Sequence, residues 1–291
     1  MSTSPTSSER KKVTTLRLRQ KKADGEPITM LTAYDFATAQ AVDQAGIDVV
    51  LVGDSLGMVV LGYDTTLPVT MDEMIHHSKA VGRAARWALL VGDMPFLSYQ
   101  VSTEEAVRNA GRFLQEARMD AVKLEGGRER RAAVEAIVAA GIPVMGHLGL
   151  TPQSVHQLGG FRPQAREAAS AVRLAEDAQI LQQAGCFALV LESIPGRLAQ
   201  WVSQQLDIPT IGIGAGVGCD GQVLVTHDVL GLFDRFTPRF VKKYADLHGT
   251  MGQAFRAYRE DVAARRFPAV EHTVDMPDDV WQAVAAQLAR S

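Results

Sequence analysis

Several apolar runs in the sequence end in an acidic residue or a histidine, and together these end residues could form one chemical site. In "VVLVGDSLG", four aliphatic residues typical of a buried strand lead through one glycine to Asp54. An aspartate after a strand can cap the next helix, or it can be a chemical group held at the mouth of a site. The residues at such run ends are Asp35, Asp54, Asp93, Glu125, His147 and Glu192.

The two glutamates are difficult to explain as helix caps, because glutamate is a poor N-cap and a poor strand residue. Carboxylates that converge on one opening raise each other's pKa unless a cation compensates them. Oxygen ligands without a cysteine cluster favour Mg²⁺, which takes one or two carboxylates. Lys123 lies two residues before Glu125, on the same side of its strand, where it can bind an anion. We therefore expect a divalent metal, a lysine that holds an acid, and one further carboxylate as a base.

The elements that must position these residues alternate between short apolar runs and stretches with helical periodicity. Eight such units within about 230 residues predict an α/β fold of the (β/α)8 TIM-barrel type, whose active site lies at the C-terminal ends of the strands. The dinucleotide-binding glycine pattern expected of a Rossmann fold is absent after the first run. The segment "GQVLVTHDVLGLF" fits a helix or a strand, and we favour a helix. The expected strands are 27–35, 48–54, 88–95, 121–127, 143–150, 188–193, 208–216 and 239–244.

Composition restricts the class of protein. The chain has 291 residues, 46% of them hydrophobic, and a net charge of −3, which argues against nucleic acid or an anionic membrane as a partner. Two cysteines without metal-binding spacing fit the reducing cytoplasm, and no apolar run has membrane-spanning length. We expect a disordered tail at 1–20, the catalytic barrel at 21–270 and a C-terminal helical extension at 271–291.

Long ordered blocks of the chain resemble the ketopantoate hydroxymethyltransferases (3-methyl-2-oxobutanoate hydroxymethyltransferases). The resemblance runs from about residue 27 to about 270, and Ala165 departs from it at a place where relatives often have glycine. It implies an enzyme of pantothenate biosynthesis in the cytoplasm that works as a homodecamer. The blocks are "LTAYD", "LVGDSLGMVVLGYDTTLPVT", "GDMPF", "VKLEGG", "GIPVMGHLGLTPQSV", "LVLESIP" and "IPTIGIGAGVGCDGQVLV".

The resemblance also implies a reaction and its residues. A hydroxymethyl group passes from 5,10-methylenetetrahydrofolate to 3-methyl-2-oxobutanoate (2-oxoisovalerate), giving 2-dehydropantoate through a Mg-stabilised enolate. The implied magnesium ligands are Asp54, Asp93 and Glu125. The implied contacts to the 2-oxo acid are Asp54, Ser55, Asp93 and Lys123. Glu192 is the implied proton acceptor.

Other motifs leave two interpretations open. His147 can be a hydrogen-bond donor or proton relay, or a structural histidine. The glycines of "GIGAG" can bind phosphate, as in other barrels, or let the folate approach. We expect Asp35 to cap the first helix of the barrel. The pairs His76–His77 and His227–Asp228 are expected at the surface or at an interface.

Two rival functions remain. One is a Mg²⁺-dependent 2-oxo acid C–C lyase or mutase of the phosphoenolpyruvate mutase and isocitrate lyase kind, which typically needs a reactive cysteine in a loop near the site. Neither Cys186 nor Cys219 has that context. The other is a non-catalytic barrel that binds a phosphorylated ligand, which would not need several convergent acids.

Overall fold

The computed structural model describes residues 10–290 and contains a closed barrel of eight parallel strands. Each strand pairs with the next along the chain, and β8 closes the barrel on β1. The predicted (β/α)8 TIM barrel is therefore confirmed. The strands are β1 (Ile28–Thr32), β2 (Val49–Val52), β3 (Leu89–Asp93), β4 (Ala121–Glu125), β5 (Val144–Gly149), β6 (Ala188–Glu192), β7 (Thr210–Ile213) and β8 (Gly221–Leu224).

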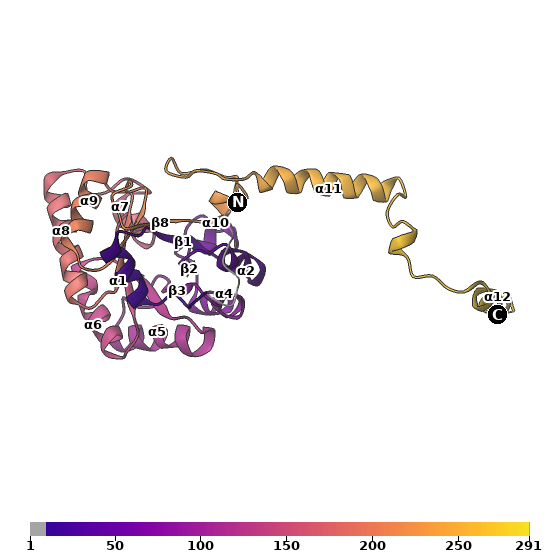
Figure 1. The fold of residues 1–291 in the computed structure, drawn as a ribbon, viewed down its shortest axis with the longest axis horizontal. Helices are drawn as coiled ribbons and strands as arrows, with labels where there is room; N and C mark the ends of the chain where they lie inside the picture. The colour runs from indigo at the N-terminus through magenta and orange to yellow at the C-terminus, as the bar shows by residue number, and fades with distance from the viewer. Residues whose placement is uncertain (1–9, 291) are drawn as a thin grey trace. The chain divides into compact units, whose positions relative to one another are not determined.

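Amphipathic helices surround the strands (Figure 1). In α5 the buried residues Ala106, Ala110 and Phe113 recur every three or four positions, so one face packs on the barrel. Gly92 makes this packing possible, since a Cβ there would lie 2.2 Å from the Phe113 ring. The longer helices around the barrel are α2 (Phe36–Gln44), α4 (Met71–Ala84), α5 (Thr103–Ala117), α6 (Arg131–Ala139), α8 (Ala168–Gln183) and α9 (Gly196–Gln205). Single-turn elements are α3 (Leu56–Val59), η1 (Arg128–Arg130), η2 (Pro152–Ser154), α7 (Val155–Leu158) and α10 (Thr226–Val229).

The N-terminal segment differs from the expected tail. Helix α1 spans Thr15–Asp24, and its Leu18 is fully buried against residues that fill the barrel interior. Lys21 in the same helix forms an ion pair of 2.8 Å with Asp48, which directly precedes β2. The prediction of disorder through residue 20 is therefore wrong from Thr15 onward, while residues 1–9 lie outside the described part of the chain.

The eighth strand also differs from the prediction. "GQVL" forms β8 and "THDV" forms the short helix α10, so this segment is not one helix. Residues 239–244, expected as the eighth strand, form no strand. The barrel closes at an earlier segment than predicted, since β8 already pairs with both of its neighbours: Gly221 is the register partner of Ile211 in β7 and of Ile28 in β1.

The chain divides into two compact units, the first ending at Tyr244 and the second beginning at Ala245. This division lies before the expected boundary at residue 270. The second unit contains α11 (Leu247–Ala263), η3 (Val270–His272) and α12 (Asp278–Leu288).

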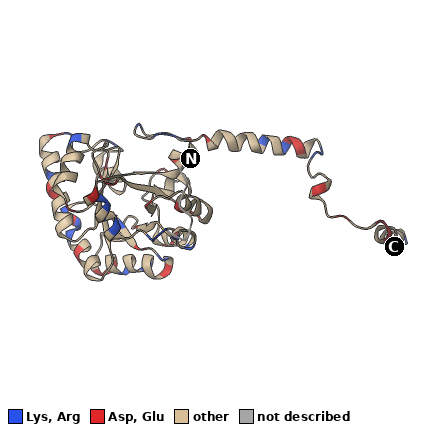
Figure 2. Cartoon of the chain, in the orientation of Figure 1, with Lys and Arg blue, Asp and Glu red and all other residues tan. Residues whose placement is uncertain are grey.

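Charges of both signs are interspersed along the helices that surround the barrel (Figure 2). Among the described helices, none combines the length and apolar character needed to cross a bilayer.

Candidate active site

Most of the polar residues predicted from the sequence lie at the inward-facing positions near the C-terminal ends of the strands. Side chains alternate along a strand, so every second residue points into the barrel. Val91, Met145 and Val190 belong to the apolar interior. Two residues after each of them come Asp93, His147 and Glu192. In β4 the inward series runs from Ala121 through Lys123 to Glu125.

Strand register places these residues beside one another. Asp93 is the register partner of Lys123 on the next strand, and Glu125 is the partner of His147. The Lys123 Nζ donates a hydrogen bond of 2.7 Å to Asp93 Oδ1 and lies 3.7 Å from Glu125 Oε1. All four side chains are buried. The lysine predicted to share a side with Glu125 therefore does so.

Asp54 belongs to the same layer although it follows β2 rather than ending it. Its backbone N–H donates to Asp93 Oδ2 at 3.2 Å, and its Oδ2 accepts from Gln153 Nε2 at 2.9 Å. Helix α3 has Ser55 at its N-cap, without a side-chain capping bond. Asp54 is only 4% exposed. Its side chain therefore lies among the buried carboxylates that line the cavity and does not cap α3.

Burial and mutual repulsion determine the charges of this layer. Burial, then the charges of Asp93 and Glu125, raise the pKa of Asp54 well above its usual value. Burial also raises the pKa of Asp93, against the opposing Lys123 ammonium. Burial acts to raise the pKa of Glu125, but contacts with His147 and Lys123 outweigh it and lower that pKa. Burial acts to lower the pKa of Lys123, but the surrounding carboxylates raise it.

The residue types of this cluster, three carboxylates around one ammonium, are those that a divalent cation and an anionic substrate would need. Within residues 10–290, no three His, Cys, Asp or Glu side chains are arranged as a complete set of metal ligands. Mg²⁺ commonly binds through one or two carboxylates and keeps places for water and substrate oxygens. The all-oxygen donors Asp54, Asp93 and Glu125 suit that mode, and a bound cation would offset the repulsion that raises the pKa of Asp54.

His147 connects the carboxylate layer with Glu192. Its Nδ1 lies 3.3 Å from Glu125 Oε1, and its Nε2 lies 3.3 Å from Glu192 Oε2. Neither nitrogen has a partner in hydrogen-bond geometry among the described residues. Burial and Lys123 act to lower the pKa of His147, but the two glutamates raise it to about 9. The imidazole ring of His147 therefore lies between the carboxylate cluster and Glu192.

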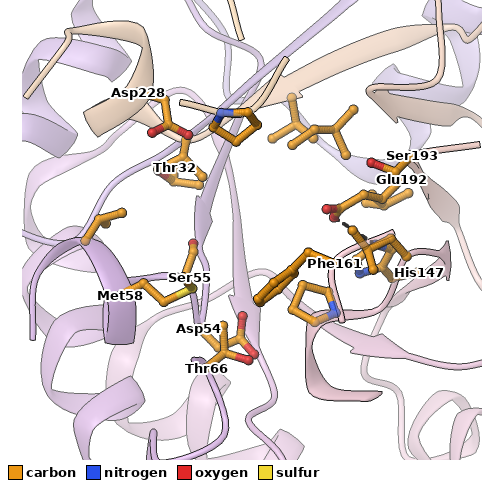
Figure 3. Close-up of a pocket in the computed structure, with 18 of the residues that line it drawn as sticks. Thr32, Asp54, Ser55, Met58, Thr66, His147, Phe161, Glu192, Ser193 and Asp228 are labelled. Atoms are coloured by element: carbon orange, nitrogen blue, oxygen red, sulfur yellow. Dashed lines mark ion pairs between the residues drawn. The ribbon is translucent and has the colours of Figure 1, made fainter. Parts of the chain in front are cut away.

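These residues line a cavity of about 600 Å³ at the C-terminal end of the strands. Figure 3 shows Asp54 and Ser55 on one side and His147 and Glu192 on the other, with the Glu192 carboxylate directed into the cavity. Ser55 Oγ is 2.9 Å from the Tyr34 hydroxyl, which orients it. The outer lining is apolar and aromatic: Met58, Phe161, Pro163, Phe233, Phe236, Pro238 and Phe240.

The other motifs have clear outcomes. Asp35 caps α2 as predicted, since its side chain accepts a hydrogen bond from the Thr38 backbone N–H. His77 contacts the Tyr34 carbonyl through Nδ1, outside the cavity lining. Asp228 was expected at the surface or at an interface but is buried and lines the cavity, and burial raises its pKa to about 6. Ala165 has a φ of +54°, in the left-handed region that favours glycine.

Sequence patterns did not identify Gln153, Tyr99, Thr32 and Asp228 as part of this region. Tyr99 lies in a loop and Gln153 in the single-turn element η2, where no periodicity indicates which residues are buried. The block "TPQSV", part of the family resemblance, was the one available signal for Gln153.

Both cysteines lie at the opposite end of the barrel from the cavity. Cys186 lies two residues before β6 and Cys219 lies two residues before β8, so both are at the N-terminal end of the barrel. Burial raises the pKa of the Cys186 thiol to about 12. Neither cysteine contributes to the lining of the cavity.

Comparison with known proteins identifies a family that the chain matches over most of its length. The ketopantoate hydroxymethyltransferase family profile matches residues 12–270. The chain is similar to the 3-methyl-2-oxobutanoate hydroxymethyltransferase of Syntrophus aciditrophicus (strain SB), with 58% identity over 92% of this chain and 98% of the relative. The enzyme of the same name from Moorella thermoacetica is 59% identical over 91% of this chain and 98% of its own length.

A solved structure with the same barrel is a phosphoenolpyruvate phosphomutase from Streptomyces platensis subsp. rosaceus. Its TM-score is 0.59 at 14% identity, with 95% of this chain and 96% of that chain covered. At that identity the likeness shows the fold alone. The extent of the family match and the near full-length identity to its members establish that this chain belongs to the ketopantoate hydroxymethyltransferase family.

Proposed function

We propose that this protein transfers a hydroxymethyl group from 5,10-methylenetetrahydrofolate to 3-methyl-2-oxobutanoate, giving 2-dehydropantoate in pantothenate biosynthesis. The observation that carries the proposal is a buried layer of three carboxylates and one lysine that faces Glu192 across a single cavity. The near full-length identity to enzymes of that name supports the same activity.

The residues around the floor of the cavity bind the 2-oxo acid in this proposal. Asp54, Asp93 and Glu125 would hold Mg²⁺, which supplies Lewis-acid stabilisation of negative charge on the keto oxygen. Lys123 and Ser55 line the cavity and orient the substrate carboxylate by charge and hydrogen bonding. Asp93 fixes the ammonium of Lys123, so that this charge is already oriented before substrate binds.

Glu192 acts as the base that removes the C3 proton. Its carboxylate lines the cavity and is less buried than the other carboxylates, with a side-chain exposure of 15%. His147 Nε2 lies 3.3 Å from Glu192 Oε2, on the side of the carboxylate that lines the cavity wall. Water breaks both C–N bonds of the folate methylene group, which releases formaldehyde and tetrahydrofolate. The C3 carbon of the enolate then attacks the formaldehyde carbon, and the resulting alkoxide takes up the proton held by Glu192 to give the hydroxymethyl group of the product.

The aromatic outer part of the cavity supports the folate as co-substrate. A small 2-oxo acid needs only the polar floor, which leaves space beside Phe161, Phe233 and Phe240. Aromatic side chains favour flat heteroaromatic ligands through stacking. Two of the aromatic side chains on that surface, Phe233 and Phe236, pack edge to face, with their ring centroids 5.4 Å apart.

The lyase or mutase alternative lacks the thiol that it typically uses, because neither cysteine lines the cavity. We also infer that the protein works in the cytoplasm as a homo-oligomer, which the resemblance suggests is a decamer. The free, largely buried cysteines suit a reducing compartment.

A direct assay tests the proposed activity. Purified protein incubated with 3-methyl-2-oxobutanoate, 5,10-methylenetetrahydrofolate and Mg²⁺ should form 2-dehydropantoate, and chelation of the metal should stop the reaction. Cleavage of the 2-oxo acid without transfer of the one-carbon unit would instead support the lyase alternative.

A further inference from the structure

Gln153 is a loop residue with the burial of a core residue. It lies in η2, after β5, and is 5% exposed. A buried amide must have partners for its two N–H groups and its carbonyl, since unsatisfied polar groups are costly inside a protein. Its partners are therefore informative about why glutamine occupies this position.

All polar atoms of the Gln153 side chain are used. The Nε2 donates to Asp54 Oδ2 and to the Met94 carbonyl, both at 2.9 Å. The Oε1 accepts from the Tyr99 hydroxyl at 2.6 Å. Because a backbone carbonyl can only accept, the contact with Met94 fixes which end of the amide faces Asp54.

The backbone of the same residue holds a second carboxylate. The Gln153 N–H donates to Glu125 Oε2 at 3.0 Å. The Tyr99 hydroxyl, which fixes the Gln153 carbonyl, also accepts from the Glu125 backbone N–H at 3.1 Å. One residue thus binds one oxygen of each of two carboxylates, of which Asp54 follows β2 and Glu125 ends β4.

The uncharged amide suits this position. A lysine at this position would neutralise part of the negative charge of the carboxylate cluster. An amide donates hydrogen bonds to the carboxylates and leaves the negative charge of the cluster available to a ligand. Asp54 Oδ1 accepts no hydrogen bond from the described residues, so the amide occupies one carboxylate oxygen and leaves the other for a ligand.

We propose that Gln153 is a positioning residue that orients Asp54 and Glu125 for binding of a divalent cation and the 2-oxo acid. This inference rests on the proposed function of the site. Groups that orient metal-binding side chains typically change metal affinity or activity 10- to 100-fold when they are removed.

The test compares Gln153→Met with the wild type and with Gln179→Met. Methionine keeps the length and the backbone bond to Glu125 but removes the hydrogen bond to Asp54. Within the part of the chain that the structure describes, Gln179 donates only to the exposed Gln205 carbonyl, and it serves as the matched control. Calorimetric titration with Mg²⁺ alone should give a dissociation constant about 10- to 100-fold higher for Gln153→Met, with kcat/KM lowered by a similar factor.

Near-UV circular dichroism establishes that each variant is folded before binding is measured. If Gln153→Met does not fold, Gln153→Glu keeps the shape and the acceptor for Tyr99 while turning a carboxylate oxygen toward Asp54, and the same loss is expected. A folded variant whose Mg²⁺ affinity and kcat/KM stay within twofold of the wild type would overturn the proposal. A wild type without transfer activity but with a weakened Mg²⁺ site in Gln153→Met would refute the proposed function and retain the role of Gln153.

Discussion

At the scale of single residues, two aspartates that follow strands have different roles. Asp35 is an exposed helix cap, whereas Asp54 is a buried carboxylate beside two others. Sequence alone permitted either role for both residues. The difference arises from tertiary contacts, since Gln153 and Asp93 reach Asp54 from other strands and loops.

This difference predicts opposite effects of substitution. Asp54→Asn should lower Mg²⁺-dependent turnover at least about 100-fold, yet leave metal-free protein no less stable, because it removes a carboxylate whose charge burial and its neighbours disfavour. Asp35→Ala should lower the free energy of unfolding by about 1 kcal/mol without changing turnover. Urea unfolding in chelator and steady-state assays with Mg²⁺ measure both. Full activity in Asp54→Asn would remove Asp54 from the proposed site.

At the scale of elements, helix α1 stabilises the barrel from its N-terminal end. Leu18 is fully buried, while Leu16 in the same helix is 76% exposed. Lys22 adds an ion pair of 2.7 Å to Asp220, next to β8, and complements the pair between Lys21 and Asp48. The helix therefore belongs to the folded barrel.

Leu18→Ala should destabilise the protein by about 2–5 kcal/mol, because it leaves a cavity among the apolar residues of the barrel interior. Leu16→Ala is the matched control and should change the free energy of unfolding by less than about 0.5 kcal/mol. Chemical denaturation monitored by circular dichroism gives both values. Equal stability of the two variants would show that α1 does not contribute to the core.

Whether an element could be predicted from the sequence depends on whether its own residues determine it or contacts with distant residues do. Strands β2 to β6 were predictable because each is an apolar run with a charged residue or a histidine at or just beyond its C-terminal part, and a stretch of helical periodicity follows along the chain. Helix α1 was missed because "TLRLRQKKAD" is polar and buries only Leu18. Strand β8 was missed because only four residues complete the barrel, and their pairing with β7 and β1 is a long-range contact. Gln153 could not be identified from a periodic pattern either, because the contacts that bury it are with residues distant in the sequence.

At the scale of the whole molecule, the second unit carries the clearest indication of self-association. In α11, Met251, Phe255, Tyr258 and Val262 recur at helical spacing on one face, and each is at least 41% exposed. Large exposed apolar faces commonly mark protein interfaces. We expect this face to be covered by another copy of the chain.

Light scattering should accordingly give a mass at least twice the chain mass of 31.5 kDa. The double change Phe255→Glu with Tyr258→Glu should shift the protein toward monomers, whereas Arg259→Glu on the same helix should not. A wild type that scatters as a monomer at micromolar concentration would contradict the prediction.

The central claim is that Glu192 removes the C3 proton of a 2-oxo acid held by the carboxylate and lysine layer. Exchange of that proton in D₂O, followed by NMR with Mg²⁺ present, measures this step apart from folate chemistry. Wild-type protein should exchange the proton, and Glu192→Gln should bind the 2-oxo acid normally but exchange it about 100- to 10,000-fold more slowly. Exchange by Glu192→Gln at a rate near that of the wild type would contradict the account and assign the base to another residue.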